Sequence, residues 1–273
     1  MENELLYDGK EYRVDWEKLE QQLADPQTTL MILCNPQNPA GNIWDRETLA
    51  RIGALCKQYD VIVVSDEIHC DLTKPGTEYI PFASVDDTCR DISVTCIAPT
   101  KTFNLAGLQT AAVYAENSIL HHRMWRQLNT DEVAEPNAFA IQATIAAFQY
   151  GEEWLDELRE YVEKNKQYVT EFLQEKIPLI HPVAGDATYL MWLDCRKITE
   201  SGRQFVKFIR KTSGLYVSGG NQYGRGGEGF LRVNVATSKL VVEDGMQRLY
   251  ESVDARLRSE EHTSELQSPL NLV

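Results

Sequence analysis

The sequence predicts an α/β fold, with a mostly parallel sheet between two layers of helices and a smaller α+β unit after it. The first observation behind this prediction is a series of short, continuously apolar segments such as Val61–Ser65. Runs without polar alternation are typical of strands that are buried on both faces. The second observation is that segments with helical periodicity separate these runs, which is the order expected of an α/β domain. With 273 residues, the chain is long enough for one large or two modest domains.

The expected elements of the large unit follow in order along the chain. Its strands are expected at residues 28–34, 61–65, 92–97 and 110–114. Asp45 can cap the helix after the first strand, in which Leu49, Ile52, Leu55 and Cys56 recur at helical spacing. Three further helices are expected at residues 119–128, 138–150 and 153–175.

A smaller unit is expected after the last of these helices. Its strands are expected at residues 188–193, 215–217 and 229–235, and an amphipathic helix at residues 242–257. We expect the boundary between residues 165 and 180, which gives a large domain over residues 1–170 and a small domain over residues 171–257.

Residues 258–273 differ in pattern from the rest of the chain. The peptide Arg258–Ser268 has no apolar period, and it matches the in-frame translation of a common sequencing-library adapter. We therefore interpret residues 258–273 as a non-native, adapter-derived tail and exclude it from the fold. A genuine disordered tail is the alternative interpretation.

Composition and charge narrow the class of function. Lysine and arginine number 27 against 41 aspartate and glutamate, a formal net charge of −14, which argues against nucleic acid or an anionic membrane as the main partner. No apolar run of the sequence approaches the roughly 20 residues that a membrane-spanning helix needs. The six cysteines form no C-x-x-C pair, which favours reduced thiols in a cytoplasmic protein over disulfides or a zinc site.

A lysine and an aspartate at the ends of expected strands point to pyridoxal 5'-phosphate (PLP). Lys101 follows the strand at 92–97, and Asp66 follows the strand at 61–65. A partly desolvated lysine amine can attach an aldehyde cofactor covalently. A carboxylate at the end of an apolar strand needs a partner, and the protonated pyridine nitrogen of PLP is a fitting one. The alternatives are a surface lysine in a turn and an aspartate that caps a turn or helix.

Two polar residues near these strands are candidates for contacts with the cofactor ring. Asn38 lies in the Pro-bounded turn 35–41, at the carboxyl end of a strand, where open α/β sheets bind ligands. Its amide could reach the ring hydroxyl, whereas we expect Asn35 to serve the turn itself. His69, three residues after Asp66, could hydrogen-bond the ring hydroxyl or shape the entrance. A purely structural histidine is the alternative.

Arg232 is the candidate for binding a substrate carboxylate. It lies on the expected strand 229–235, where alternation sends Leu231 and Val233 to one face and Arg232 to the other. A guanidinium can hold a carboxylate through two parallel hydrogen bonds. An exposed strand arginine in a surface ion pair is the alternative. The glycines at 219–220 and 224–229 are not followed by a suitable helix, which argues against a phosphate-binding loop.

With these motifs together, the chain from about Leu5 to Leu257 resembles the fold-type I PLP-dependent enzymes of the aminotransferase class I/II superfamily. The segments 65–69, 98–104, 151–155 and 188–194 resemble more narrowly the cystathionine β-lyase (C–S lyase) branch, whose members include a maltose-regulon modulator. The usual aminotransferases of the superfamily carry tyrosine where His69 stands.

The resemblance implies a role for each candidate residue. Lys101 would attach PLP and act as general base, and Asp66 would pair with the pyridine nitrogen. Asn38 and His69 would lie by the ring, Thr100 would help bind the phosphate, and Arg232 would bind the substrate carboxylate. No metal is implied.

The sequence departs from the pattern of the superfamily at the expected phosphate site. Ala98 stands where many members have a serine, and Gln109 stands where many have an arginine. Such enzymes also carry a further amino-terminal segment before the equivalent of Leu5, with phosphate-binding and ring-stacking residues. The chain is therefore expected to be an amino-terminally truncated fragment that is inactive by itself.

Three functions remain open at this point. The first is a PLP-dependent C–S lyase that forms a thiol, pyruvate and ammonia by β-elimination from a cysteine S-conjugate. The second is an aminotransferase, which shares the first chemical step. The third is a non-catalytic regulatory module that keeps the PLP fold. The expected partners are a small amino-acid substrate and, when full length, a second copy in a homodimer.

Overall fold

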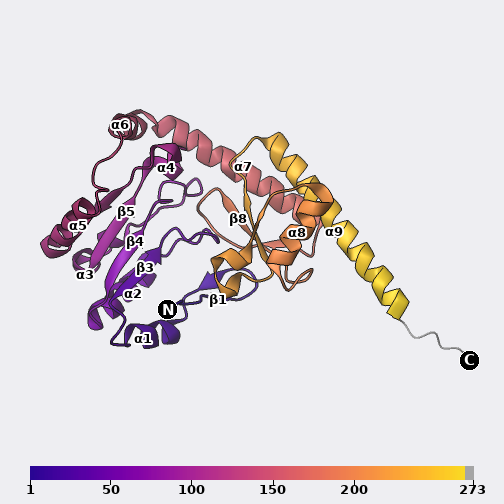
Figure 1. The fold of residues 1–273 in the computed structure, drawn as a ribbon, viewed down its shortest axis with the longest axis horizontal. Coiled ribbons are helices and arrows are strands. Elements are labelled where there is room, and N and C mark those ends of the chain that lie inside the picture. Colours follow the sequence, from indigo (N-terminus) through magenta and orange to yellow (C-terminus); the bar gives the residue numbers. More distant parts are fainter. Residues whose placement is uncertain (268–273) are drawn as a thin grey trace, which may run out of the picture. The chain divides into compact units, whose positions relative to one another are not determined.

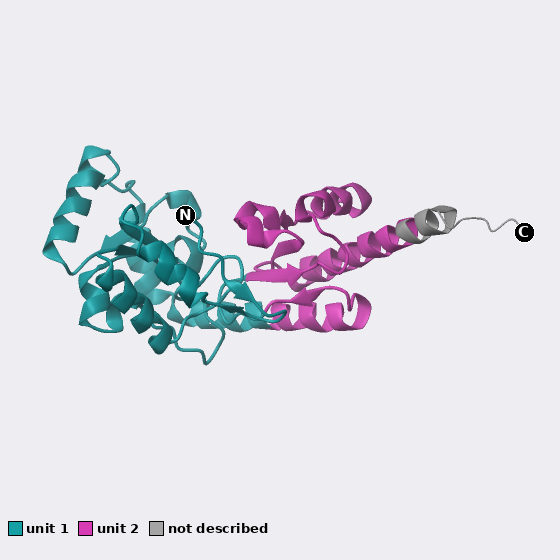
Figure 2. Cartoon of the chain, turned by 90° about the horizontal axis from the view of Figure 1, so that it is seen from below, with its two compact units in different colours: residues 1–163, 184–189 teal, residues 164–183, 190–273 magenta. Residues whose placement is uncertain are grey.

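The computed structural model describes residues 1–267, and the side chains of residues 1–259. Contacts group the chain into two compact units, coloured teal and magenta in Figure 2. The first unit comprises Met1–Glu163 and Ala184–Tyr189, and the second comprises Lys164–Val183 and the chain from Leu190 onward. The boundary expected near residue 170 stays a prediction.

A four-stranded sheet forms the centre of the first unit. Its strands are β3 (Leu30–Cys34), β4 (Ile62–Asp66), β5 (Ser93–Ile97) and β6 (Ala112–Tyr114), in that spatial order. Figure 1 shows β3, β4 and β5 side by side. These three are parallel and β6 is antiparallel to β5. The prediction of an α/β fold is confirmed, because helices connect these parallel strands.

Helices and a small hairpin complete the first unit. They are β1 (Leu6–Tyr7), β2 (Tyr12–Arg13), α1 (Trp16–Leu23), α2 (Arg46–Gln58), η1 (Phe82–Ser84), α3 (Asp87–Asp91), α4 (Pro99–Thr102), η2 (Ala106–Leu108), α5 (Ser118–Thr130), α6 (Ala140–Tyr150) and the first part of α7 (Glu152–Lys176). The expected cap of α2 is confirmed: the Asp45 carboxylate accepts a hydrogen bond from the Thr48 N–H at 2.7 Å. This bond also holds the pKa of Asp45 below its ordinary value.

The two faces of the sheet in the first unit are buried to different extents. Successive side chains of a strand alternate between faces, and Leu33, Val63 and Ser65 point into a core with α1 and α2. The other face carries Ile32, which is 70% exposed, and the half-buried Asp66. The sheet was expected to be buried on both faces. Within the described residues, only one face is buried.

The second unit holds a sheet with the order β7-β8-β10-β9. Its elements are the second part of α7, β7 (His181–Pro182), β8 (Leu190–Asp194), α8 (Gly202–Ser213), β9 (Ser218–Gly219), η3 (Gly220–Tyr223), η4 (Arg225–Gly227), β10 (Phe230–Asn234) and α9 (Lys239–Gln267). Strand β8 is buried along its whole length. On its neighbour β10, the Phe230 ring stacks on the Trp192 ring at 5.1 Å between centroids.

Two expected elements of the second unit differ in the structure. The strand expected at 215–217 is wrong, because pairing with β10 is made by Ser218 and Gly219. Tyr216 is instead exposed and lies beneath the Arg210 guanidinium. Helix α9 continues past the expected end at Leu257 to Gln267. An ion pair one turn apart, Arg258 with Asp254 at 2.8 Å, supports this continuation. Residues 268–273 lie outside the described residues, and the adapter origin of the tail stays a prediction.

Candidate active site

Five of the predicted site residues lie in the first unit, on three segments that follow neighbouring strands. Asn38 is in the loop after β3, Asp66 ends β4 with His69 just beyond it, and Thr100 and Lys101 are in α4 directly after β5. Because β3, β4 and β5 are parallel and adjacent, their carboxyl ends meet at one edge of the sheet. The structure thus gathers these segments at the edge where open α/β sheets bind ligands.

Asp66 lies at the centre of this edge. Its carboxylate is half-buried and accepts one hydrogen bond from the Ile68 N–H at 3.3 Å. Cys34 and Cys96 flank it in register, on the same face of the sheet. Burial raises the pKa of both thiols, which keeps them uncharged. Asp66 is therefore set between neutral neighbours on the open face of the sheet, where a carboxylate can meet a cationic ring nitrogen.

Lys101 and Thr100 lie on the short helix α4. Both side chains are half-buried. Among the side chains of residues 1–259, no described hydrogen bond or ion pair engages the Lys101 ammonium. The lysine is thus partly desolvated without being committed to a carboxylate. Such an amine is available for covalent attachment of an aldehyde.

His69 is only 3% exposed and packs against Tyr189. The two rings meet edge to face, with 5.8 Å between their centroids. Tyr189 belongs to the segment Ala184–Tyr189, which contacts by main-chain bonds both the loop after β3 and the loop after β4. Ala187 N–H donates to the Gly41 carbonyl at 3.1 Å, and Thr188 N–H donates to the Leu72 carbonyl at 2.7 Å. This segment steadies the residues around Asn38 and His69.

A buried polar network lies behind Asp66. Glu67 is 2% exposed, and its carboxylate accepts hydrogen bonds from the Ser65 hydroxyl at 2.8 Å and the Phe82 N–H at 3.0 Å. Tyr79 donates to the Asn35 carbonyl at 2.8 Å. The network therefore joins the loops that carry Asn38 and Asp66. The buried Asn35 amide accepts from the Trp44 N–H at 3.2 Å, as expected of a structural residue.

Arg232, the sixth predicted residue, lies in the second unit on β10. It pairs with Trp192 of β8 on one side and Ser218 of β9 on the other. Its guanidinium carbon lies 4.9 Å from the centroid of the Tyr223 ring, and the residue is half-buried. The aromatic ring orients the guanidinium plane through a cation–π contact. The role of Arg232 toward the residues of the first unit stays a prediction.

The residues of the first unit fit PLP better at its ring than at its phosphate. At the ring, Asp66 offers a carboxylate on an open sheet face, and Lys101 offers an uncommitted amine. At the phosphate, Thr100 is half-buried on α4, but the neighbouring Ala98 is a buried methyl group and Gln109 is exposed in a left-handed turn. Neither Ala98 nor Gln109 brings a positive charge to a dianionic phosphate.

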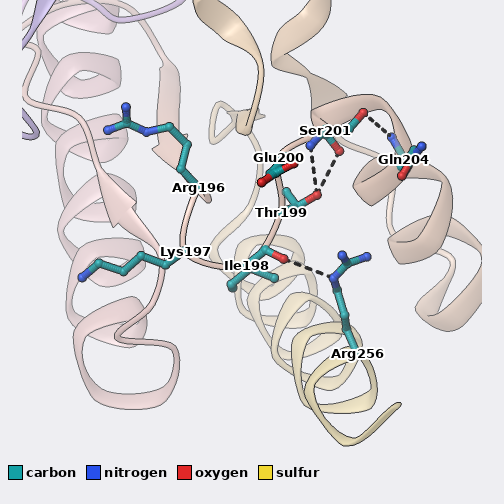
Figure 3. A pocket seen from close by; sticks show the side chains of 8 residues that line it. All are labelled: Arg196, Lys197, Ile198, Thr199, Glu200, Ser201, Gln204 and Arg256. Atoms are coloured by element: carbon teal, nitrogen blue, oxygen red, sulfur yellow. Dashed lines mark hydrogen bonds between the residues drawn. The ribbon is translucent and has the colours of Figure 1, made fainter. Parts of the chain in front are cut away.

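The second unit contains a hollow of its own. It measures about 510 Å³ and is lined by Arg196, Lys197, Ile198, Thr199, Glu200, Ser201, Gln204 and Arg256. Its three cationic side chains extend in different directions (Figure 3). Arg196 binds the Asp194 carboxylate through two nitrogens at 2.9 and 2.7 Å, and Arg256 donates to the Ile198 carbonyl. This hollow therefore does not form a convergent anion site. Among the described residues, no cluster of His, Cys, Asp and Glu side chains could hold a metal.

Comparisons with curated proteins connect this arrangement to known enzymes. The chain is 42% identical over 249 residues to the cystathionine beta-lyase PatB of Bacillus subtilis, covering 91% of this chain and 64% of that protein. It is 32% identical to the protein MalY of Escherichia coli, covering 88% of this chain and 61% of that protein. The chain thus spans less than two thirds of the length of these relatives.

Solved structures match the fold closely. Cystalysin from Treponema denticola, which contains PLP, superimposes with a TM-score of 0.90 at 29% identity, covering 93% of this chain and 65% of that one. The PLP-bound C–S lyase from Staphylococcus hominis gives a TM-score of 0.85 at 31% identity, covering 92% of this chain and 61% of that one. The family aminotransferase class I and II matches residues 5–249, which include all six predicted site residues. The chain belongs to the aminotransferase class I and II family.

Proposed function

We propose that this chain carries the active-site residues of a PLP-dependent C–S lyase. The enzyme would cleave the Cβ–S bond of a cysteine S-conjugate such as cystathionine, and with one water it would release a thiol, pyruvate and ammonia. The observation that carries the proposal is the placement of Asp66 and Lys101 at the same end of the adjacent strands β4 and β5.

The relatives favour a lyase over an aminotransferase. The cystathionine beta-lyases match this chain at 29 to 42% identity. The aspartate aminotransferase of Bacillus subtilis matches at 23%. The buried His69 supports the same choice, since it stands where the sequence resembles the lyase branch.

The residues of the first unit would bind and orient PLP in distinct ways. Lys101 would attach the cofactor through its amine, and Asp66 would hold the proton on the ring nitrogen. Asn38 and His69 would border the ring hydroxyl, and Thr100 would donate to the phosphate. When bound, PLP supplies an electron-accepting ring that stabilises negative charge on the substrate α-carbon.

Proton transfer and substrate binding would fall to Lys101 and Arg232. The Lys101 amine would take the proton from the α-carbon as general base. Arg232 would hold the substrate carboxylate through the fork of its guanidinium. The Cβ–S bond would break with both electrons passing to sulfur, and the proton taken up by Lys101 would be returned to the sulfur so that it leaves as a thiol.

The lysine assignment can be tested by trapping the cofactor. The test uses a full-length chimera, in which the matched part of this chain replaces the corresponding segment of the Bacillus subtilis relative. After incubation with PLP and reduction with borohydride, peptide mass spectrometry should find the label on Lys101. Lys101→Ala should abolish both the label and turnover. Lys57→Ala, which removes a surface ion pair with Asp91, should change neither. A label on another lysine would refute the assignment.

The same chimera separates the lyase from an aminotransferase. A lyase should release thiol and pyruvate from cystathionine without a second keto acid. Product that forms only when a keto acid is added, with no thiol, would show an aminotransferase instead. Binding of PLP without turnover of any amino acid would favour a regulatory module.

We further propose that the full-length protein works as a homodimer in the cytoplasm. Support for a partner comes from exposed apolar side chains on β3 and α6, which include Ile32 and Ile141. Support for a reducing compartment comes from the six cysteines, all of which are free thiols. No helix among the described residues combines the length and apolar character needed to cross a membrane.

A further inference from the structure

Helix α4, which carries Lys101, is a single turn with little stability of its own. It spans Pro99–Thr102 and ends at Phe103, whose N–H donates to the Pro99 carbonyl at 2.9 Å. Its N-cap residue, Ala98, provides no side-chain hydrogen bond. One turn of helix is marginal in water because few bonds offset the entropy of fixing its backbone. The orientation of Lys101 must therefore depend on contacts that α4 makes with other elements.

One such contact joins α4 to the loop after β4. The Thr102 hydroxyl donates to the Asp71 carboxylate at 2.9 Å. Thr102 is fully buried and is the direct neighbour of Lys101. A hydroxyl–carboxylate bond is charge-assisted, and shielding from water strengthens it. This bond therefore adds a constraint on α4 that the single turn cannot provide through its own main-chain hydrogen bonds.

Asp71 can act as a fixed point because its own loop is held on both sides. Before it, the buried Glu67 anchors the start of the loop to Ser65 and Phe82. After it, Arg159 of α7 donates to the Thr73 carbonyl at 2.9 Å and to the Thr73 hydroxyl at 2.6 Å. The loop between these anchors has little freedom, so the Asp71 carboxylate is presented to Thr102 from a defined place.

A second contact joins the end of α4 to the helices α6 and α7. The Phe103 ring packs against Phe148 of α6 and Trp154 of α7, with centroids 5.2 and 5.9 Å away. This aromatic contact fixes the distance of α4 from the helices, but it provides no directional bond. The Thr102–Asp71 hydrogen bond is directional and restricts rotation of the turn.

We infer that Asp71 is a positioning residue for Lys101, acting through the hydroxyl of Thr102. The bond fixes the rotation of α4, and with it the direction from which the Lys101 amine reaches a cofactor held by Asp66. The inference rests on the proposed function, because it gives Asp71 a role toward a PLP-binding lysine. If the inference is right, Thr102 and Asp71 influence the pKa of the PLP-bound lysine as well as the stability of the fold.

The test compares Thr102→Val with Thr102→Ser in the full-length chimera. Valine keeps the buried volume and removes the hydroxyl, whereas serine keeps the hydroxyl and removes a methyl group. The readout is the pH midpoint of the absorbance change of lysine-bound PLP. Thr102→Val should shift this midpoint by about half a pH unit or more, and Thr102→Ser should stay close to the parent. Asp71→Ala combined with Thr102→Val should shift it no further than either change alone, because both remove the same bond.

A matched control removes an unrelated threonine hydroxyl. Thr170 of α7 donates to the Lys166 carbonyl at 2.9 Å and lies in the second unit. Thr170→Val should leave the midpoint unchanged even if it lowers stability. A parent-like midpoint in Thr102→Val, or an equal shift in Thr102→Ser, would overturn the role of Asp71. Failure of the unsubstituted chimera to attach PLP at Lys101 would instead overturn the proposed function on which the inference rests.

Discussion

Glu67 shows how a buried carboxylate can be tolerated beside a site that needs its own negative charge. Its described hydrogen-bond donors are neutral groups, the Ser65 hydroxyl and the Phe82 N–H. Burial raises the pKa of Glu67, and these hydrogen bonds oppose the shift only in part. The neighbouring Asp66 is half-buried at the edge of the sheet. Two adjacent carboxylates thus have different environments, and burial favours the neutral form of Glu67.

Glu67→Gln should become stabilising relative to the parent as the pH rises. The folded-state pKa of Glu67 is raised above its ordinary value of 4.5, so the native state binds a proton that the unfolded state releases. The stability contributed by this proton is complete below the ordinary pKa and is lost as the pH rises through the folded-state pKa. Glutamine keeps an acceptor for Ser65 and Phe82 without a charge.

Denaturant unfolding of both proteins between acidic and neutral pH measures this effect. The difference in unfolding free energy should move in favour of Glu67→Gln across that range, since the other carboxylates are common to both proteins and cancel. A difference that does not change with pH would contradict the burial of an ionisable group at this position.

Arg232→Ala should weaken substrate binding in the full-length chimera more than it changes the chemical step. Loss of one partner of a buried charge pair costs about 2–5 kcal/mol, and the half-buried Arg232 is the proposed partner of the substrate carboxylate. The expected result is a higher KM for cystathionine with a smaller change in kcat. Arg210→Ala is a matched control, because Arg210 also lies over an aromatic ring, Tyr216, at 3.9 Å. Kinetics equal to those of the parent would remove Arg232 from the substrate site.

At the scale of elements, the junction between α6 and α7 controls how closely Phe103 can approach. Gly151 ends α6 and directly precedes α7. A Cβ atom at this position would lie 2.4 Å from the Ala147 carbonyl oxygen and 2.6 Å from the Phe103 ring. Both distances are shorter than van der Waals contact, so α6 or the Phe103 side chain would have to move.

Gly151→Ala should therefore destabilise the chain by about 1–3 kcal/mol, the usual cost of overpacking. Gly107→Ala is the matched control, because no atom lies within 4 Å of its Cβ position. The midpoint of denaturant unfolding should fall for Gly151→Ala and stay within error for Gly107→Ala. Equal midpoints would show that the junction can relax without cost.

Whether an element could be predicted from the sequence depended on how local its signal is. Strands β3, β4 and β5 were predictable because each is a short, continuously apolar run between turn signals. Strand β9 was misplaced because its two residues, Ser218 and Gly219, have no apolar pattern and are defined by pairing with β10. Pairing between distant segments leaves no local signal.

The candidate site also contains residues that local motifs indicate and contacts that they do not. Lys101, Asp66 and His69 were predicted from local motifs at strand ends, where residue type and position together indicate the chemistry. Tyr189, which packs on His69, and Asp71, which binds Thr102, were missed. Their partners lie far away in the sequence, and a tyrosine or an aspartate alone is too common to indicate a contact.

At the scale of the whole molecule, the described chain leaves much apolar surface in contact with water. On β3, Leu30 and Ile32 are 50% and 70% exposed, and on α6 Ile141 and Ile145 are 55% and 50% exposed. Phe139, just before α6, is 76% exposed. Monomeric proteins rarely leave large contiguous apolar patches uncovered, since each buried Å² is worth about 25 cal/mol. These exposed apolar residues should therefore favour self-association when the chain is alone.

The purified chain should accordingly self-associate and should bind PLP weakly. Thr100 would meet the phosphate without help from a charged side chain at position 98 or 109, so loss of PLP on dialysis is expected, and light scattering should show species larger than a monomer. Ile32→Glu and Ile145→Glu together should reduce association, because charges on an exposed surface oppose its burial. Leu240→Glu, at a position on α9 that is 76% exposed, should leave association unchanged. A monodisperse monomer that retains lysine-bound PLP would contradict this prediction. It would mean that the exposed sheet face does not cause association and that the sparsely charged phosphate site does not weaken PLP binding.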